Sequence, residues 1–354
     1  MAGIYIASTT TRAGKSLMTL SLGLILQKTG MSVGYFKPVG RLPQIREELL
    51  GDADALVVQE VLGQNAPANL VTPVMLPRNL HELAVWKDNP EASSIELIRY
   101  AYKKLSEGRD HMLVSGTGTF PAAGRFAGTD SLHVVRQLGL KVLFVERYSS
   151  GINYDELLFL KTALGDAMLG VVINRVPSED LRDVKRILSP WLREQGIAVH
   201  GIIHNEPELA AMRVADLAQG VNGRVVASNA HAALMVRGFV IGTMQVDNFM
   251  SHLRRKAGSA VIVGGDRSDL QLAALHAQSP CLILTGNIAP SDLIRSTAEA
   301  KGVPLVVVKE DTYSVARVVE RILSSKKLRE LHQIRLGAEL VENALHLPGL
   351  LRLL

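Results

Sequence analysis

The sequence predicts an α/β protein with two domains: a mostly parallel sheet covered by helices on both faces, and then a smaller α/β domain. Short runs rich in Val, Ile and Leu alternate with longer helical patterns through the first two hundred residues, which is typical of parallel βαβ units. Several of these runs are apolar throughout, as strands buried on both faces are. A length of 354 residues agrees with two domains of about 150 residues each.

The first domain is expected to span residues 1–207. Its strands are the β-branched runs, predicted at Ile4–Ser8, Ser32–Pro38, His111–Gly116, Val142–Arg147, Gly170–Val176 and Val199–Ile203. Its helices are predicted between those runs, at Ser16–Thr29, Asp54–Leu62, Ile95–Ser106, Leu132–Leu138, Tyr154–Ala163 and Asp180–Glu194. The domain boundary is placed at Asn205–Pro207, where a polar segment with proline precedes a weakly patterned stretch.

The second domain is expected to span residues 208–325 and to alternate strands and helices as well. Its strands are predicted at Arg224–Ala227, Phe239–Thr243, Ala260–Gly264, Cys281–Gly286 and Pro304–Val308. Its helices are predicted at Asp247–Lys256, Ser268–His276, Ser291–Ala300 and Ser314–Leu323. Residues 326–354 are predicted to form an amphipathic helix and an apolar tail, Leu347–Leu354, which packs on a domain or on a second subunit.

Composition excludes several classes of protein. The net charge is +5, but Lys and Arg are scattered and aromatic residues make up only 5%, so we expect no nucleic-acid partner. Cys281 is the only cysteine and lies in an apolar run, which predicts a buried, inert thiol and a reducing, cytoplasmic location. We find neither a signal peptide nor an apolar run of about 18 residues, and expect no membrane association.

A phosphate-binding loop is predicted at the amino terminus. A short apolar strand, a Thr-rich loop and Gly14-Lys15-Ser16 directly precede a helix rich in Leu. Backbone N–H groups at a helix start bind anions, a glycine lets them approach closely, and lysine and serine supply a charge and a Mg²⁺ ligand. The pattern therefore indicates a P-loop NTPase-like fold. The predicted nucleotide-binding residues are Thr11, Arg12, Ala13, Gly14, Lys15, Ser16 and Leu17.

The loop departs from the usual pattern at its first position. The motif G-x-x-x-x-G-K-[ST] begins with glycine, whereas this sequence has Thr9 there. An ordinary strand-to-helix turn with a solvated lysine is the alternative, but the combination of strand, loop and buried helix favours phosphate binding.

Four motifs in the right order resemble dethiobiotin synthetase. They are the loop Ser8–Ser16, the second-strand segment Tyr35–Val39, the segment Asp52–Leu56 and the strand Val172–Val176. The resemblance covers about the first 205 residues, and the same module is similar to the amino-terminal part of long bacterial phosphotransacetylases. It implies ATP and Mg²⁺ as cofactors.

The resemblance also gives single residues provisional roles. Lys15 and Lys37 would be the catalytic cations, since ligands of open α/β sheets bind at the carboxyl ends of strands. Asp54 would hold Mg²⁺ together with Ser16 and with Thr19 or a water, because carboxylate and hydroxyl oxygens suit that ion. Asn174 would pair with the adenine edge. The alternatives are a surface lysine at 37, a helix cap at Asp54 and a turn asparagine at 174.

Three positions depart from the synthetase pattern. Ser115 stands where the family has an acidic metal ligand, Ser8 replaces the first loop glycine, and Arg12 replaces an acidic loop residue that faces the diamine substrate. A hydroxyl is a weaker Mg²⁺ ligand than a carboxylate. We therefore expect nucleotide binding and do not expect dethiobiotin synthesis.

The second domain resembles the DRTGG domain through Gly265–Leu272 and Leu282–Asn287. Asn287 replaces a usual glycine there, and asparagine tolerates positive φ better than most residues do. Asp266 and Arg267 are expected to form a structural ion pair, and Ser268 to cap the following helix.

These features predict an ATP-binding regulatory or accessory protein related to the amino-terminal region of phosphotransacetylase. An acyl-transfer domain would follow these two modules in the long enzymes, and this chain ends there, so we expect no acyl transfer. The alternatives are an ATP- and Mg²⁺-dependent synthetase or ligase acting on a small carboxylate, and a degenerate module that only assembles. The expected ligands are a nucleotide and a small carboxylate or metabolic effector, and a homo-oligomer, preferably a dimer, is expected.

Overall fold

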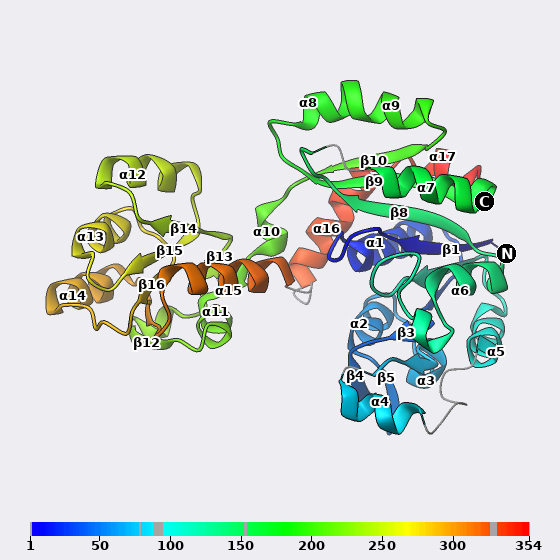
Figure 1. Cartoon of the computed structure of the whole chain (residues 1–354), viewed down its shortest axis with the longest axis horizontal. Coiled ribbons are helices and arrows are strands. Elements are labelled where there is room, and N and C mark those ends of the chain that lie inside the picture. The colour runs from blue at the N-terminus through cyan, green and yellow to red at the C-terminus, as the bar shows by residue number, and fades with distance from the viewer. Residues whose placement is uncertain (1, 78, 88–94, 152–153, 326–330, 354) are drawn as a thin grey trace. The chain divides into compact units, whose positions relative to one another are not determined.

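The computed structural model describes residues 2–77, 79–87, 95–151, 154–325 and 331–353. The chain forms two compact units, of which the second comprises residues 206–328 (Figure 1). The residues before and after that segment together make the first unit. The carboxyl-terminal residues therefore return to the unit that contains the amino terminus.

The first unit is built on a six-stranded parallel sheet with the order β10-β9-β8-β1-β7-β2. The predicted strands are confirmed, and their bounds are β1 (Ala2–Ala7), β2 (Val33–Phe36), β7 (His111–Ser115), β8 (Lys141–Arg147), β9 (Met168–Val176) and β10 (Val199–His204). Strand β1, which leads into the predicted phosphate loop, lies between β8 and β7 inside the sheet. The loop therefore starts at the carboxyl end of a central strand.

Helices cover both faces of this sheet. Along β1, Ile4 and Ile6 point to one face and Tyr5 and Ala7 to the other, and all four are at most 2% exposed. The helices of the unit are α1 (Lys15–Lys28), α2 (Ala53–Val61), α3 (Ala68–Val71), α4 (Leu80–Lys87), α5 (Ile95–Ser106), α6 (Ser131–Leu138), α7 (Asp155–Leu164), α8 (Leu181–Asp183), α9 (Ser189–Glu194), α16 (Leu331–Ala344) and α17 (Leu347–Leu351). Among them α5, α6, α7 and α9 pack on the face of Tyr5. Helix α1 contacts β1 and β7 on the face of Ile4, where its Gly23 lies against Leu113, so both faces are covered.

The helix after the phosphate loop, α1, is buried along most of its length because α16 packs against it (Figure 1). A helix that is apolar on all sides needs cover on all sides. The contact is close: a Cβ atom on Gly337 of α16 would lie 2.5 Å from Cδ1 of Leu17. Ile334 and Val341 of α16 are 3% and 0% exposed. The predicted carboxyl-terminal helix thus belongs to the core beside the phosphate loop.

The carboxyl-terminal tail packs on the edge strand of the same sheet. The backbone N–H of His346 donates to the carbonyl of His200 at 2.7 Å, and Leu350 is fully buried. Residues 326–330 and Leu354, which belong to the predicted helix and tail, lie outside the described residues. No helix within the described ranges is both long and apolar enough to cross a bilayer.

Two small pairs of strands in the first unit, and the pair β11 (Met212–Arg213) and β13 (Met235–Val236) in the second, were not expected from the sequence. Strands β3 (Val39–Gly40) and β6 (Val74–Met75) pair in parallel, and β4 (Pro43–Arg46) and β5 (Leu49–Asp52) form a hairpin. The hairpin turns at Glu47 and Glu48, both with positive φ. Turns of this kind usually contain Asn-Gly or Asp-Gly, so two glutamates gave no turn signal.

The second unit has a five-stranded sheet with the order β12-β17-β16-β15-β14, in which only β12 is antiparallel to its neighbour. The elements that build this unit are α10 (Pro207–Ala210), β11 (Met212–Arg213), α11 (Val214–Gly220), β12 (Arg224–Ala227), β13 (Met235–Val236), β14 (Gly238–Gly242), α12 (Val246–Arg255), β15 (Ser259–Gly264), α13 (Ser268–His276), β16 (Leu282–Thr285), α14 (Asp292–Lys301), β17 (Leu305–Val307) and α15 (Thr312–Ser325). Helices α12, α13 and α14 cover one face, and α11 and α15 cover the other. The predicted α/β character is confirmed.

Details of the second unit both confirm and correct the sequence predictions. Cys281 is fully buried, and burial raises the pKa of its thiol to about 12, as expected for an inert residue. Asn287, which stands where the DRTGG pattern has glycine, has a positive φ of 57°, as we expected for that position. The expected ion pair between Asp266 and Arg267 is wrong, because the Arg267 guanidinium binds Asp269 through Nε and Nη2, at 3.0 and 2.8 Å. Since α13 begins at residue 268 itself, no serine side chain caps it.

Replacing Gly337 with leucine should destabilise the first unit, because the new side chain has no room against Leu17. Overpacking of this kind costs about 1 to 3 kcal/mol. Glu339→Leu places the same side chain on the exposed face of α16 and should change the free energy of unfolding by less than about 0.5 kcal/mol. Urea denaturation of both full-length variants measures the difference, and equal costs would contradict the packing described.

Candidate functional site

The predicted phosphate loop, Ser8–Ser16, follows β1 directly and ends in the first turn of α1. Gly14 directly precedes α1 with a φ of 108°, and a Cβ atom there would lie 2.3 Å from Nδ2 of Asn174. Both the backbone conformation and the close approach exclude any side chain at this position. Glycine is therefore required for α1 to start where it does.

Asn174 holds the loop from the neighbouring part of the sheet. It lies within β9, is 5% exposed, and donates from Nδ2 to the carbonyl of Ala13 at 2.8 Å. Its Oδ1 accepts the backbone N–H of Arg175 at 2.9 Å. The residue is thus part of a strand and not of a turn, and both ends of its amide are engaged by the protein.

Lys15 lies at the centre of the site. Its ammonium donates to Oγ of Ser8 at 2.6 Å and to the carbonyl of Gly118 at 2.7 Å. Burial lowers the pKa of Lys15 to about 8; the charge of Glu146 opposes this shift and that of Lys37 adds to it. Both hydrogen-bond acceptors of the Lys15 ammonium are neutral oxygen atoms. They do not cancel its positive charge, which therefore remains available to attract an anion.

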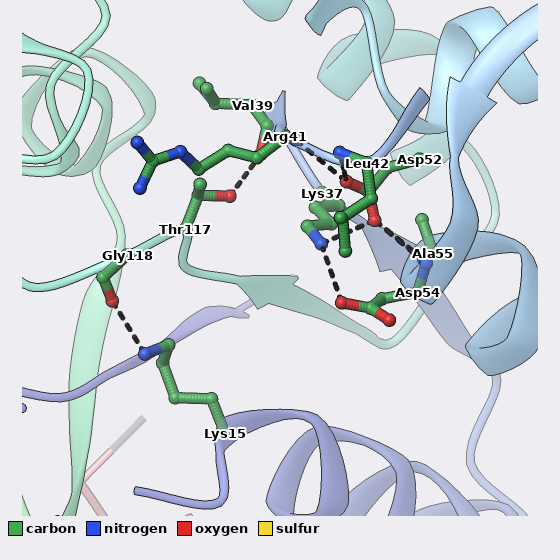
Figure 2. Close-up of polar contacts among 10 residues, drawn as sticks. All are labelled: Lys15, Lys37, Val39, Arg41, Leu42, Asp52, Asp54, Ala55, Thr117 and Gly118. Carbon is green, nitrogen blue, oxygen red and sulfur yellow. Dashed lines mark hydrogen bonds and ion pairs between the residues drawn. The ribbon is translucent and has the colours of Figure 1, made fainter. Parts of the chain in front are cut away.

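The other predicted cation, Lys37, is buried in an ion-pair cluster (Figure 2). Its Nζ atom lies 2.6 Å from Oδ1 of Asp52 and 3.8 Å from Oδ2 of Asp54. The residue is 7% exposed, so the alternative of a surface lysine is wrong. Asp52 ends β5 and caps α2, and Asp54 lies in the first turn of that helix, so the start of α2 fixes the position of this lysine.

Asp52 belongs to a motif named in the sequence analysis, which gave it no role in this cluster. It is fully buried and caps α2, accepting the backbone N–H groups of Asp54 and Ala55. Its second oxygen, Oδ2, accepts hydrogen bonds from the backbone N–H groups of Arg41 and Leu42, at 2.9 and 3.0 Å. The alternative that Asp54 caps the helix is therefore wrong, because the cap is Asp52. An aspartate directly before a helical run is a sequence signal for such a cap.

Hydrogen bonds and charge keep Asp52 ionised. Burial alone would raise the pKa of its carboxyl, but the charge of Lys37 and the hydrogen bonds from Lys37, Arg41 and Leu42 outweigh burial and lower it. The contribution of this pair to stability is therefore present at neutral pH and is lost as the pH falls through the lowered pKa.

The segment after β7 closes the site between the two lysines. Thr117 donates its hydroxyl to the carbonyl of Val39, and Gly118 accepts from Lys15 (Figure 2). A Cβ atom on Gly118 would lie 3.6 Å from Nη1 of Arg41, so the guanidinium of Arg41 is near this turn. Arg41 is an additional cation that no motif indicated.

The remaining predicted loop residues differ in exposure. Thr11, Arg12 and Ser16 are exposed, and Arg12 has a φ of 59°. Ala13 is fully buried and Leu17 is 8% exposed, because one packs inside the loop and the other against α16.

The predicted Mg²⁺ ligands supply two oxygen groups. Ser16 offers an exposed hydroxyl in the first turn of α1, and the Asp54 side chain is 24% exposed. Ser115, at the position of the family's acid, is buried and hydrogen-bonds the hydroxyl of Tyr35. Within the described ranges no three His, Cys, Asp or Glu residues form a metal-binding group. This donor set suits Mg²⁺ only if phosphate oxygens complete it, as in many nucleotide sites.

Glu146 is a second residue that the sequence analysis missed. It is the penultimate residue of β8, is 4% exposed, and accepts hydrogen bonds from the backbone N–H and the hydroxyl of Thr9 at 2.6 and 2.8 Å. Burial raises its pKa to about 7, against the hydrogen bonds from Thr9 and the charge of Lys15. A single glutamate at the end of an apolar strand gave no motif by which to find it.

Comparison with protein-family models places this site in a known family. A model described as AAA domain matches residues 2–213, which include the loop, both lysines and Asn174. The chain belongs to the AAA domain family. A second model, the DRTGG domain, matches residues 216–322. The AAA domain is thus followed by a DRTGG domain, as the sequence motifs predicted.

Curated relatives agree with both predicted resemblances. The chain is 32% identical over 176 residues to the ATP-dependent dethiobiotin synthetase BioD of Methanococcus vannielii, with 48% of this chain and 78% of that protein covered. The phosphate acetyltransferase of Pseudomonas putida is 26% identical over 326 residues, covering 86% of this chain. The chain spans about half the length of such relatives, 45% in this case.

Solved structures provide a weaker comparison. The MinD cell division protein of Aquifex aeolicus is 16% identical, and the match covers 59% of this chain and 84% of that one with a TM-score of 0.37.

Asp52→Asn should destabilise the AAA domain by about 3 kcal/mol, because it leaves the buried ammonium of Lys37 without its closest counter-charge. Asp54→Asn weakens the longer, 3.8 Å ion pair of a side chain that is 24% exposed and should cost less than about 1 kcal/mol. The free energy of unfolding in urea at neutral pH distinguishes the two isosteric variants, and a larger cost for Asp54→Asn would refute this ranking.

Glu146 should make the stability of the AAA domain depend on pH. Its pKa is higher in the folded than in the unfolded state, so the native state binds the extra proton and stability falls as the pH rises. This residue should lower the free energy of unfolding by roughly 2 to 3 kcal/mol between about pH 5 and pH 8. Glu146→Gln should remove that slope. Urea denaturation across this range tests it, and parallel slopes for both proteins would exclude a raised pKa.

Proposed function

We propose that this chain is an ATP-binding regulatory or accessory protein related to the amino-terminal region of phosphotransacetylase. The observation that carries the proposal is the arrangement of Lys15, whose ammonium is largely buried and bonded to two neutral oxygens beside the start of α1. An anion bound to the N–H groups of the loop would neutralise this cation and meet the positive end of the helix dipole. A nucleoside triphosphate fits that requirement and the relatives named above.

Mg²⁺ is part of the proposal. Ser16 and Asp54 would hold it, and when bound it would neutralise charge on the phosphates. Lys15 would bind the terminal phosphates, and Asn174 and Gly14 would hold the loop backbone in the anion-binding conformation. Adenine recognition by Asn174 would require its hydrogen bond to Ala13 to be shared or exchanged.

We prefer a regulatory role to a synthetase because, of the groups that phosphoryl transfer would need, one lysine is held in ion pairs and one carboxylate is replaced by serine. Lys37 is neutralised by Asp52 and Asp54, and Ser115 stands in place of a carboxylate. Both features support binding without phosphoryl transfer to a second substrate. A cytoplasmic homo-oligomer, preferably a dimer, also stays part of the proposal, and light scattering of the full chain measures its mass.

Lys15→Met should weaken nucleotide binding by about 10- to 100-fold, the value of one charged hydrogen bond of 1.5 to 3 kcal/mol. Lys28→Met changes an exposed lysine at the other end of the same helix and should leave the affinity unchanged. Calorimetric titration of ATP and ADP with Mg²⁺ into the three proteins measures these effects.

Two outcomes would count against the proposal. Absence of heat or competition with the wild-type chain at millimolar ATP would remove nucleotide binding altogether. Release of ADP on addition of one of a panel of small carboxylates would identify a synthetase instead of a regulatory protein.

A further inference from the structure

Thr9, which stands where phosphate loops usually have glycine, is bound through its side chain to the neighbouring strand. Ala7 of β1 is paired with Phe144 of β8, so Thr9 and Glu146, two residues farther along each chain, come together at the sheet edge. The N–H of Thr9 donates to Oε1 of Glu146 at 2.6 Å, and its hydroxyl donates to Oε2 at 2.8 Å. A glycine could form only the first of these bonds.

The pair fixes the point at which the loop leaves β1. A bidentate contact with a carboxylate defines both the position and the orientation of the residue that is bound. Ser8, directly before Thr9, accepts a hydrogen bond from the ammonium of Lys15 at the other end of the loop. Glu146 therefore acts on the phosphate site through Thr9 and not by touching the anion.

The carboxylate of Glu146 is only partly compensated. From α1, Lys15 attracts it through space, while its ammonium is bonded to Ser8 and Gly118. From α7, the charge of Glu156 repels it. The hydroxyl of Tyr154, which is 7% exposed, faces the same region and has no hydrogen-bond partner in the described part of the chain. Thr9 supplies both hydrogen bonds that the structure gives this carboxylate.

An anion on the phosphate loop would change this balance. It would bring negative charge close to Glu146 and would draw the attraction of Lys15 to itself. Both effects disfavour the ionised carboxylate, which then takes up a proton from solvent. No bond to the nucleotide is made or broken in this step.

We propose that Glu146 and Thr9 form a proton-linked clamp that positions the phosphate loop, so that anion binding by the loop is coupled to protonation of Glu146. Glu146 is a positioning residue in this scheme, and the coupling makes nucleotide affinity higher at acid pH. The inference rests on the proposed nucleotide-binding function.

The test measures ADP binding with Mg²⁺ by calorimetry at pH 6 and pH 8, at constant ionic strength, with the full chain and with Glu146→Gln. ADP is used because it is not hydrolysed. The fall in affinity between these two pH values should be about fivefold greater for the wild type than for Glu146→Gln, since the neutral amide cannot titrate. Titrations near pH 7.5 in two buffers of different ionisation enthalpy should show greater proton uptake by the wild type.

Two substitutions of Thr9 test the clamp itself. Thr9→Val removes the hydroxyl that stabilises the ionised carboxylate, so the midpoint of the pH dependence should move to higher pH. Thr9→Ser keeps the hydroxyl and should keep the wild-type midpoint. Thermal unfolding of each variant at both pH values confirms that it is folded.

The possible results separate this inference from the proposed function. If the wild type binds ADP and Glu146→Gln shows the same pH dependence and the same proton uptake, the clamp is refuted and nucleotide binding stands. Equal midpoints for Thr9→Val and Thr9→Ser would also refute it. If the wild type binds no nucleotide at either pH, the proposed function fails and the inference fails with it.

Discussion

The contact between the loop backbone at Ala13 and Gly14 and the amide of Asn174 is the constraint on which the rest of the site depends. It holds the loop against β9 and leaves no room for a Cβ atom at Gly14, which has a positive φ. Because α1 starts directly afterwards, its first N–H groups and Lys15 are presented at the middle of the sheet edge. A longer side chain at 14 would displace the loop, the helix start and the cation together.

Charge balance divides the site into two parts. On one side Lys37 is neutralised by Asp52 and Asp54, which makes that cluster a rigid support between β2 and α2. On the other side Lys15 has neutral hydrogen-bond partners, and Glu146 is buried with a raised pKa. The first part stabilises the fold, and the second is where an added anion would change protonation. Binding chemistry is therefore expected at Lys15 more than at Lys37.

The carboxyl-terminal segment extends the nucleotide domain in a way that chain order conceals. Helix α16 follows the DRTGG domain in sequence, yet it covers the outer side of α1 and contacts Leu17 next to the loop. The packing of the phosphate-site helix thus depends on residues more than three hundred positions later. A fragment restricted to residues 2–213, the span of the AAA domain match, would leave that apolar side uncovered.

The sequence by itself determined the α/β class, nearly every main strand, the phosphate loop and its glycine, and the two families, because these depend on local periodicity and short motifs. It did not reveal Asp52, Arg41 or Glu146 as members of the site, nor the pairing of Arg267 with Asp269 in place of Asp266. Side-chain partners of this kind are set by strand register and by the cap of one helix. Only the tertiary structure brings Glu146 to Thr9, 137 positions apart, since their adjacency follows from the parallel pairing of β1 with β8 and from nothing local in either segment.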